Sequence, residues 1–416
     1  MSHARLQVNA AGWGLFGTLI IKTQGLILAL VGARALGQEE FGTLMTWIGL
    51  LYILVVVSDF GLAGFVQREV AAERLSPEHV GAHAVKVLSI TLLPFVLATA
   101  VAFALVRPDQ RIGVGATVVL VVWIELSLIN GIFTAALTGS LRFKDASNAV
   151  GIGRGVGSLG LAVLLIVHPP DGLPVLIACA LLVGEVVGFA AQIRLVPRQS
   201  FNSAFAHVAG ARQLGPYLIN NLANSAYSRG DVPVVGVFSG SRDAAIYSPA
   251  SQLQSLLLSV PTVMNTGTLA IVARGNFVNT SPELRRLVNR TLLASIAAAA
   301  AAAAVTAGTA SLWLPLLFGE PFRSSVSVVQ LLMISVPIAA IHIVLGQCLI
   351  ARGYASAISI GTAMALVVGL AALVAGTIID GAEGAAIAVI CRDALLALYC
   401  LVVWRRSTRK DSPEAG

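Results

Sequence analysis

The chain has 416 residues, of which 57% are hydrophobic and only 11% are charged, and its formal net charge is +7. A composition this apolar excludes a soluble globular enzyme, and it leaves no soluble fold that could carry a basic stripe for nucleic acid. The apolar residues fall into twelve stretches, each close to the ~20 residues that a helix needs to cross a bilayer.

In chain order, we predict spans at residues 12–33, 41–65, 86–106, 112–137, 148–168, 174–195, 214–238, 245–272, 291–316, 326–351, 354–378 and 384–404. Backbone groups in lipid must be hydrogen-bonded within the span, and these runs do not alternate as barrel strands do. The sequence therefore predicts an all-α integral membrane protein.

The basic residues predict the orientation of the spans. With the N-terminus in the cytoplasm, eighteen Lys and Arg residues fall in inside segments, five in outside segments and four within spans. Cytoplasmic connections carry such an excess, so we expect both termini to be cytoplasmic. The net positive charge also indicates attraction to anionic membrane lipids.

The chain is expected to divide into two halves. We predict an N-terminal six-helix bundle at 1–198, a cytoplasmic connection at 199–213, and a C-terminal six-helix bundle with a short basic tail at 214–416. Asp171-Gly172 and Asp380-Gly381 stand at matching places in the two halves, which indicates a weak internal repeat. Two repeated bundles around a central midplane cavity are a common plan for transporters.

Polar residues recur at helical spacing along spans seven and eight. Steps of three and four residues place each set on one face of its helix. Such rows can simply join helices, because Ser, Thr and Asn often hydrogen-bond between spans. Their depth instead favours a water-filled cavity that binds sugar hydroxyls, lined by Tyr217, Asn221, Asn224, Ser228, Asp231, Gln252 and Ser255.

Basic residues inside spans need a functional or structural explanation, because inserting each at the centre of a membrane helix costs about 2.5–3.5 kcal/mol of free energy. Lys22 lies near the centre of span one, Arg229 in span seven and Arg154 in span five. These three are candidates to bind an anion such as a diphosphate. The alternative is that they pair with buried acidic residues.

Acidic residues inside spans include Asp59, Glu125 and Glu185. A carboxylate within the membrane can bind H⁺ or Na⁺, so these residues are candidates for cation coupling. They can equally neutralise Lys22 or Arg154. The sequence has no metal-ligand spacing, nucleophile motif or phosphate-binding glycine loop, so we expect no catalytic residue, metal or cofactor.

Several short motifs resemble those of one known family. They are Asn9-Ala-Ala-Gly-Trp-Gly, Ala33-Arg34-Ala35-Leu36-Gly37, Ser58-Asp59-Phe60-Gly61-Leu62, Arg229-Gly230-Asp231, Leu317-Phe318-Gly319-Glu320-Pro321-Phe322 and Gly381-Ala382-Glu383-Gly384. Together they resemble the Wzx-type O-antigen and exopolysaccharide flippases of the multidrug/oligosaccharidyl-lipid/polysaccharide exporter superfamily. The resemblance extends over nearly the whole chain.

This resemblance implies an alternating-access flippase in the cell inner membrane. Its cargo would be a polyprenyl-diphosphate-linked oligosaccharide, which moves from the inner to the outer leaflet, and other polysaccharide-assembly proteins are expected partners. Lys22 and Arg229 would hold the diphosphate, with Asn221, Asn224 and Gln252 facing the glycan. A cation-coupled multidrug exporter of the same superfamily is the alternative. A membrane-embedded polymerase or glycosyltransferase fits less well, because every outer connection is short.

Overall fold

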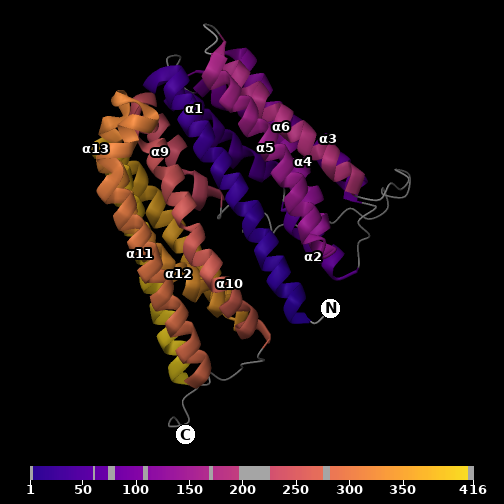
Figure 1. Ribbon diagram of the computed structural model, residues 1–416, viewed down its shortest axis with the longest axis vertical. Helices are drawn as coiled ribbons and strands as arrows, with labels where there is room; N and C mark the ends of the chain where they lie inside the picture. The colour runs from indigo at the N-terminus through magenta and orange to yellow at the C-terminus, as the bar shows by residue number, and fades with distance from the viewer. Residues whose placement is uncertain are drawn as a thin grey trace. The chain divides into compact units, whose positions relative to one another are not determined.

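The computed structural model describes residues 3–59, 61–73, 80–105, 111–167, 172–195, 225–274 and 282–410. All regular elements in these ranges are helices (Figure 1). Within them, seven helical stretches are long and apolar enough to cross a membrane. The prediction of an all-helical membrane protein is therefore confirmed.

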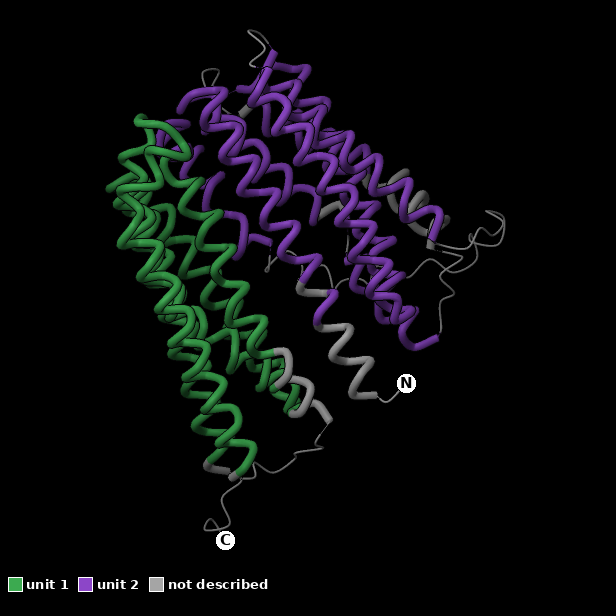
Figure 2. Tube along the Cα trace, in the orientation of Figure 1, with its two compact units in different colours: residues 1–11, 246–416 green, residues 12–245 purple. Residues whose placement is uncertain are grey.

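The helices form two compact units (Figure 2). The first in chain order contains residues 12–245 and is drawn in purple as unit 2, and the second contains residues 246–416 together with residues 1–11 and is drawn in green as unit 1. Residues 225–245 thus group with the first unit by their contacts. The expected connection at 199–213 lies outside the described residues.

The first helix, α1 (His3–Asp59), contains the first two predicted spans. It is interrupted at Gly37, where φ is 74° and ψ is 176°. A residue with a side chain would be strained in that conformation, which glycine adopts readily. The predicted boundary between residues 33 and 41 is confirmed by this break.

The predicted span 41–65 is wrong at its end. Helix α1 stops at Asp59 and a separate helix, α2 (Leu62–Ala71), begins after Gly61, whose φ is 75°. The Asp59 carboxylate accepts a hydrogen bond of 3.3 Å from the backbone N–H of Ala63, which stabilises the start of the new helix. The apolar face of α2 then packs on Ile132 and its neighbours in α4 (Val114–Gly139).

Two further helices, α5 (Phe143–Val167) and α6 (Leu173–Leu195), lie side by side in Figure 1, with α3 (Val80–Leu105) in the same unit. Helices α5 and α6 meet at Gly153 and Gly157 of α5 and at Gly184 and Gly188 of α6. A Cβ atom on Gly153 would lie 2.8 Å from the Gly184 carbonyl oxygen. Small residues let two membrane helices approach this closely.

The short helix α8 (Asp231–Ser239) and the start of α9 (Ser241–Leu257) pack against the second part of α1. The Thr43 hydroxyl donates a 2.8 Å hydrogen bond to the Ser241 hydroxyl. Gly42 and Gly236 leave no room for a side chain at this contact, because Ser241 and Thr46 occupy the space. This close packing explains why residues 231–245 belong to the first unit.

The second unit contains the rest of α9, then α10 (Ser259–Arg274), α11 (Pro282–Phe318), a 3₁₀ helix (Glu320–Ser324), α12 (Ser325–Ala351) and α13 (Ala355–Lys410). Helix α12 packs between α11 and α13. Helix α13 contains the last two predicted spans and breaks at Asp380 and Gly381, where the backbone is not helical. The predicted boundary between residues 378 and 384 is confirmed.

The predicted span 245–272 is two helices rather than one. Helix α9 ends at Leu257 and α10 begins at Ser259. Pro261 has no N–H to donate to the carbonyl of Leu257, which weakens a continuous helix at this point. Across the unit, amides join α9 and α10 to α12, because Gln254 donates to Ser335 at 2.5 Å and Asn265 donates to Gln347 at 2.8 Å.

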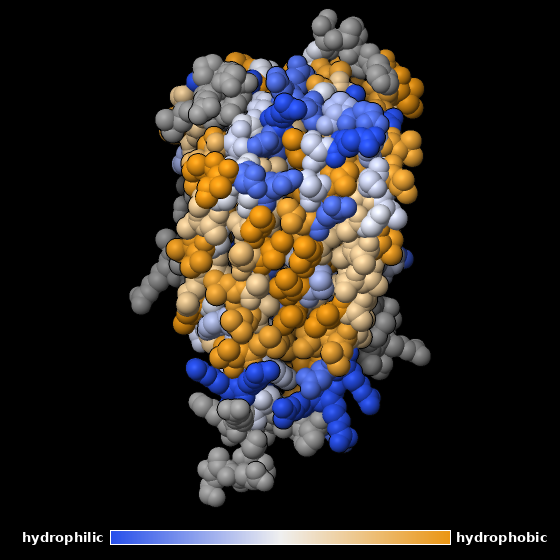
Figure 3. Space-filling view, turned by 90° about the vertical axis from the view of Figure 1, so that its left-hand side faces the viewer, coloured by the Kyte–Doolittle hydropathy of each residue, from blue (hydrophilic) through white to orange (hydrophobic). Residues whose placement is uncertain are grey.

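The surface of the second unit is apolar enough to contact membrane lipid. Large apolar side chains stay exposed along its helices, including Leu293, Leu312, Val367 and Ile379. Figure 3 shows a broad hydrophobic belt on one face of the molecule, with hydrophilic residues gathered at its two ends.

The two ends of this unit also carry different charges. Where α11 begins and α13 ends, the exposed charged residues include Arg285, Arg286, Arg290, Arg405 and Arg406. At the opposite end, Glu320, Asp380 and Glu383 are exposed beside Arg323.

Candidate functional site

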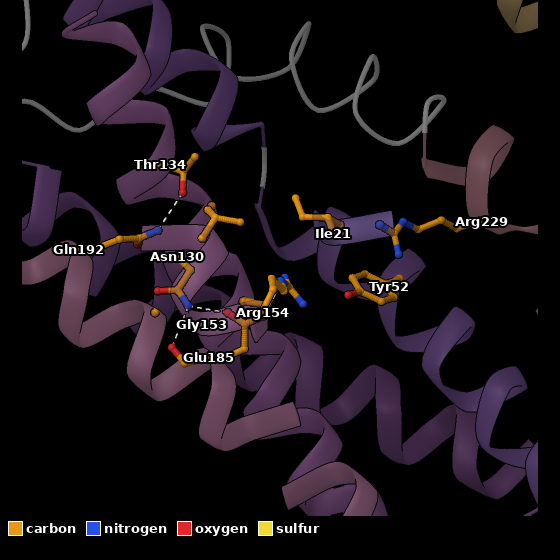
Figure 4. Close-up of a pocket in the computed structure, with 13 residues that line it drawn as sticks. Ile21, Tyr52, Asn130, Thr134, Gly153, Arg154, Glu185, Gln192 and Arg229 are labelled. Atoms are coloured by element: carbon orange, nitrogen blue, oxygen red, sulfur yellow. Dashed lines mark hydrogen bonds and ion pairs between the residues drawn. The ribbon is translucent and has the colours of Figure 1, made fainter. Parts of the chain in front are cut away.

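The candidate site is a cavity of about 270 Å³ inside the unit of residues 12–245. Helices α1, α4, α5 and α6 form its walls together with the short helical stretch at residues 225–229. Figure 4 shows how its side chains lie. The lining residues are Ile21, Tyr52, Ser127, Asn130, Gly131, Thr134, Val150, Gly153, Arg154, Glu185, Gly188, Gln192 and Arg229.

Arg154 on α5 forms an ion pair with Glu185 on α6, with 2.7 Å between Nη2 and Oε1. Both side chains are largely buried, at 15% and 6% exposed. Arg154 also donates to Gln24 Oε1 at 2.8 Å and to the Ser127 hydroxyl at 3.2 Å. Glu185 therefore neutralises Arg154 within this cluster, as one of the two sequence interpretations proposed.

A second layer of amides surrounds this ion pair. Asn130 donates through Nδ2 to Glu185 Oε2 at 2.5 Å, and Gln192 donates to the Thr134 hydroxyl at 2.8 Å. Asn130 and Gln192 are 7% and 1% exposed. The hydrogen bond from Asn130 to Oε2 and the ion pair at Oε1 together fix the position of Glu185, which in turn fixes Arg154.

The local sequence explains why the pair forms. Arg154 directly follows Gly153, and Glu185 directly follows Gly184. Because the two glycines bring the backbones of α5 and α6 together, the next residue on each helix meets its partner across the contact. Gly157 leaves room for Gln24, whose Nε2 would lie 2.7 Å from a Cβ atom at that position.

The other cation of the cavity, Arg229, is held differently. Its guanidinium carbon lies 4.0 Å from the centre of the Tyr52 ring, which is a cation–π contact. Tyr52 in turn meets Trp123 edge to face, with ring centres 5.6 Å apart. In the described parts of the chain, no carboxylate lies within ion-pair distance of Arg229, whose side chain is exposed.

Lys22 lies on α1 next to Ile21, one of the cavity-lining residues, but does not line the cavity itself. It is half-buried, and it is close enough to Arg229 for the two positive charges to repel one another. The structure thus brings Arg154, Arg229 and Lys22 into one region, and Arg154 forms an ion pair with the lining carboxylate of Glu185.

The four predicted glycan residues that the structure describes do not line this cavity. Ser228 is exposed and Asp231 is buried in the first turn of α8, whereas Gln252 and Ser255 are half-buried on α9 in the other unit. Tyr217, Asn221 and Asn224 lie outside the described residues.

Two predicted acidic residues are buried away from the cavity. Asp59 is 6% exposed and accepts the hydrogen bond that begins α2. Glu125 on α4 is also 6% exposed, and neither of its carboxylate oxygens has a hydrogen-bond partner among the residues that the structure describes.

Sequence reasoning missed several residues of the site, although a signal for them is present. On α4, Ser127, Asn130 and Thr134 follow at steps of three and four, and α6 repeats these steps at Glu185, Gly188 and Gln192. This is the same helical spacing that drew attention to spans seven and eight. Tyr52 has no such signal, because a single aromatic residue in an apolar span resembles any core residue.

The arrangement suits the recognition of an anion that carries hydroxyl groups. Arginine presents planar N–H donors that match phosphate oxygens, and hydroxyl side chains both donate and accept hydrogen bonds. The cavity, at about 270 Å³, is large enough for a small head group.

Comparisons with known proteins identify the family of the chain. The family described as polysaccharide biosynthesis protein matches residues 8–270. A relative in Haloferax volcanii, the probable low-salt glycan biosynthesis flippase Agl15, is 21% identical over 361 residues, which cover 86% of this chain and 74% of that protein.

Solved structures share the fold. The lipid II flippase MurJ in an inward closed conformation matches with a TM-score of 0.73 at 12% identity, covering 97% of this chain and 90% of that one. An outward-facing multidrug resistance MATE transporter of the MOP superfamily matches with a TM-score of 0.65 at 15% identity, covering 98% and 97%. The chain therefore has the fold of these transporters and belongs to the polysaccharide biosynthesis protein family.

Proposed function

We propose that this protein is a flippase that moves a polyprenyl-diphosphate-linked oligosaccharide from the inner to the outer leaflet by alternating access. The observation that carries the proposal is Arg229, a cation in a membrane-embedded cavity with no carboxylate partner in the described residues. A charge in such a setting is costly unless it serves a ligand. A diphosphate supplies the missing negative charge, and hydroxyl groups in the same cavity suit the attached sugar.

Two relatives support the choice of cargo. Agl15 is described as a glycan biosynthesis flippase, and MurJ as a lipid II flippase. In this proposal the protein carries out transport and no bond chemistry, which makes it a transporter rather than an enzyme. Proteins that assemble the same polysaccharide would supply and receive its cargo.

We further propose that the protein lies in the cell inner membrane with both termini in the cytoplasm. The exposed arginines Arg285, Arg286, Arg290, Arg405 and Arg406 support this orientation, because they share one end of the second unit. The positive-inside rule assigns that end to the cytoplasm, where anionic headgroups attract it.

A cation-coupled multidrug exporter is the second candidate, and Glu125 is the observation that favours it. This buried carboxylate has no hydrogen-bond partner within the described ranges, so exchange of H⁺ or Na⁺ there would change the local charge. The MATE transporters that share the fold fit this alternative. Coupling at Glu125 is also compatible with glycan export.

The test is to delete the gene and measure lipid-linked saccharides on each leaflet. We expect them to accumulate on the cytoplasmic leaflet and to be exported again when the wild-type gene is returned. Arg229→Lys should restore more export than Arg229→Ala, because it keeps the charge. Normal export in the deletion strain, together with increased sensitivity to several unrelated drugs, would favour the multidrug exporter instead.

A further inference from the structure

The two arginines of the cavity differ in whether a neighbouring residue balances their positive charge. The charge of Arg154 is balanced by Glu185 at 2.7 Å, so this pair adds almost no net charge to the cavity. Arg229 rests on the Tyr52 ring, which carries no charge, so its positive charge stays available. Lys22 adds to the positive potential at the Arg229 side, since the two charges interact.

Figure 4 shows the same division in space. Gln192, Thr134, Asn130 and Glu185 lie on one side of the view and Arg229 with Tyr52 on the other, while Arg154 lies between them.

We propose that the cavity is electrically polarised and that this polarity orients the cargo. The Arg229–Tyr52 pair is the anion-binding pole, which takes the diphosphate, and the Arg154–Glu185 pair is a neutral pole, which contacts the first sugar. This inference rests on the proposed function and adds to it the direction in which the head group lies.

The cation–π contact explains why Arg229 suits a diphosphate. The Tyr52 ring holds the guanidinium carbon 4.0 Å from its centre without a carboxylate and without cancelling the charge. A guanidinium has five N–H donors, and arginine can bind phosphate oxygens through two parallel hydrogen bonds. Tyr52 acts here as a positioning residue.

The opposite pole suits an uncharged sugar. Arg154 already donates to Gln24 and Ser127 and forms an ion pair with Glu185, and a second anion would have to compete with this buried carboxylate. A sugar hydroxyl needs no net charge, and the half-buried hydroxyl groups of Ser127 and Thr134 line this side of the cavity.

The experiment measures binding of farnesyl diphosphate to the purified full-length protein in detergent by isothermal titration calorimetry. Arg229→Gln should weaken binding about tenfold or more, the effect of losing a charged hydrogen bond. The double variant Arg154→Gln with Glu185→Gln should lose much less affinity than Arg229→Gln, because it removes both charges of a neutral pair. Arg285→Gln, an exposed arginine of the other unit, is the matched control and should bind as wild type does.

The single variant Glu185→Gln provides a second, independent readout. It frees the charge of Arg154, so it should bind farnesyl diphosphate more tightly than wild type, whereas Arg154→Gln should bind it less tightly. Should the double variant fail to fold, as judged by size-exclusion chromatography, the rise in affinity for Glu185→Gln still decides the question. Equal or weaker binding by Glu185→Gln would overturn the proposal.

The sugar pole is tested with farnesyl diphosphates that carry glucose, galactose or N-acetylglucosamine. We expect one of them to bind the wild type more tightly than the bare diphosphate, and the double variant to lose that gain while Arg229→Gln keeps it. A gain that survives in the double variant, or no gain with any of the three sugars, would overturn the sugar pole. Failure of wild type to bind any prenyl diphosphate would instead count against the proposed function.

Discussion

The contact between α5 and α6 allows a sharp prediction for Gly184→Ala. A Cβ atom on Gly184 would lie 2.7 Å from the Gly153 carbonyl oxygen, about 0.7 Å inside the 3.4 Å at which ordinary contact begins. The Cα and N atoms of Gly157 would also be 2.9 Å away. All three neighbours are backbone atoms, so the two helices must separate. Overpacking of this kind costs about 1–3 kcal/mol.

The separation should also reach the ion pair, because Arg154 and Glu185 directly follow the glycines of this contact. We expect Gly184→Ala to lower the apparent melting temperature in detergent by roughly 2–10 °C and to lower export. The matched control is Gly155→Ala on the partner helix α5, where a Cβ atom would have no neighbour within 4 Å.

The control should be as stable as wild type or slightly more stable, because alanine favours a helix by up to about 1 kcal/mol over glycine. If Gly184→Ala and Gly155→Ala have the same apparent melting temperature, the close packing of α5 on α6 does not position the site, and this prediction is refuted.

Three further predictions concern the cavity. Gly131→Leu adds a side chain to the cavity lining at a position where a Cβ atom has no neighbour within 4 Å, so it should lower export more than the melting temperature. Export by Gly155→Leu, where a Cβ atom also has no neighbour within 4 Å, should stay near wild type, and equal export by both variants would exclude this cavity from the transport path. Tyr52→Phe should retain binding of farnesyl diphosphate, whereas Tyr52→Leu should lose about threefold or more, and similar affinities would show that the ring does not position Arg229. Glu125→Gln should reduce the dependence of export on a proton or sodium gradient, measured in proteoliposomes, and an unchanged dependence would place coupling at another residue.

Hydropathy predicted most of the helices because the membrane demands long apolar runs, whatever the tertiary contacts are. It also placed the turns at Gly37 and at Asp380–Gly381, where the backbone leaves the helical region. It missed the breaks after Asp59 and Leu257, because a cap or a proline interrupts a helix without lowering the mean hydropathy of the surrounding window.

The cavity was harder to predict for a different physical reason. Arg154 and Glu185 were both recognised as candidates, but which base meets which acid depends on how far each helix is rotated about its axis. That rotation follows from the glycines at the α5–α6 contact, and the cation–π contact of Arg229 follows from the path of α1. The rotation and path of one helix relative to another cannot be predicted from the single residues of each apolar span.

The cation–π contact between Arg229 and Tyr52 makes the transport cycle sensitive to the membrane voltage. An aromatic ring leaves the charge uncancelled, so under the proposed function the vacant carrier moves a positive charge when it turns over. Displacing one charge through the full field is worth about 2.3 kcal/mol per 100 mV. A cell that is negative inside would therefore draw the vacant carrier back toward the cytoplasm to reload. A potassium ionophore, added with equal potassium concentrations on both sides so that the voltage is abolished, should slow net export, and an unaltered rate would argue against such a bias.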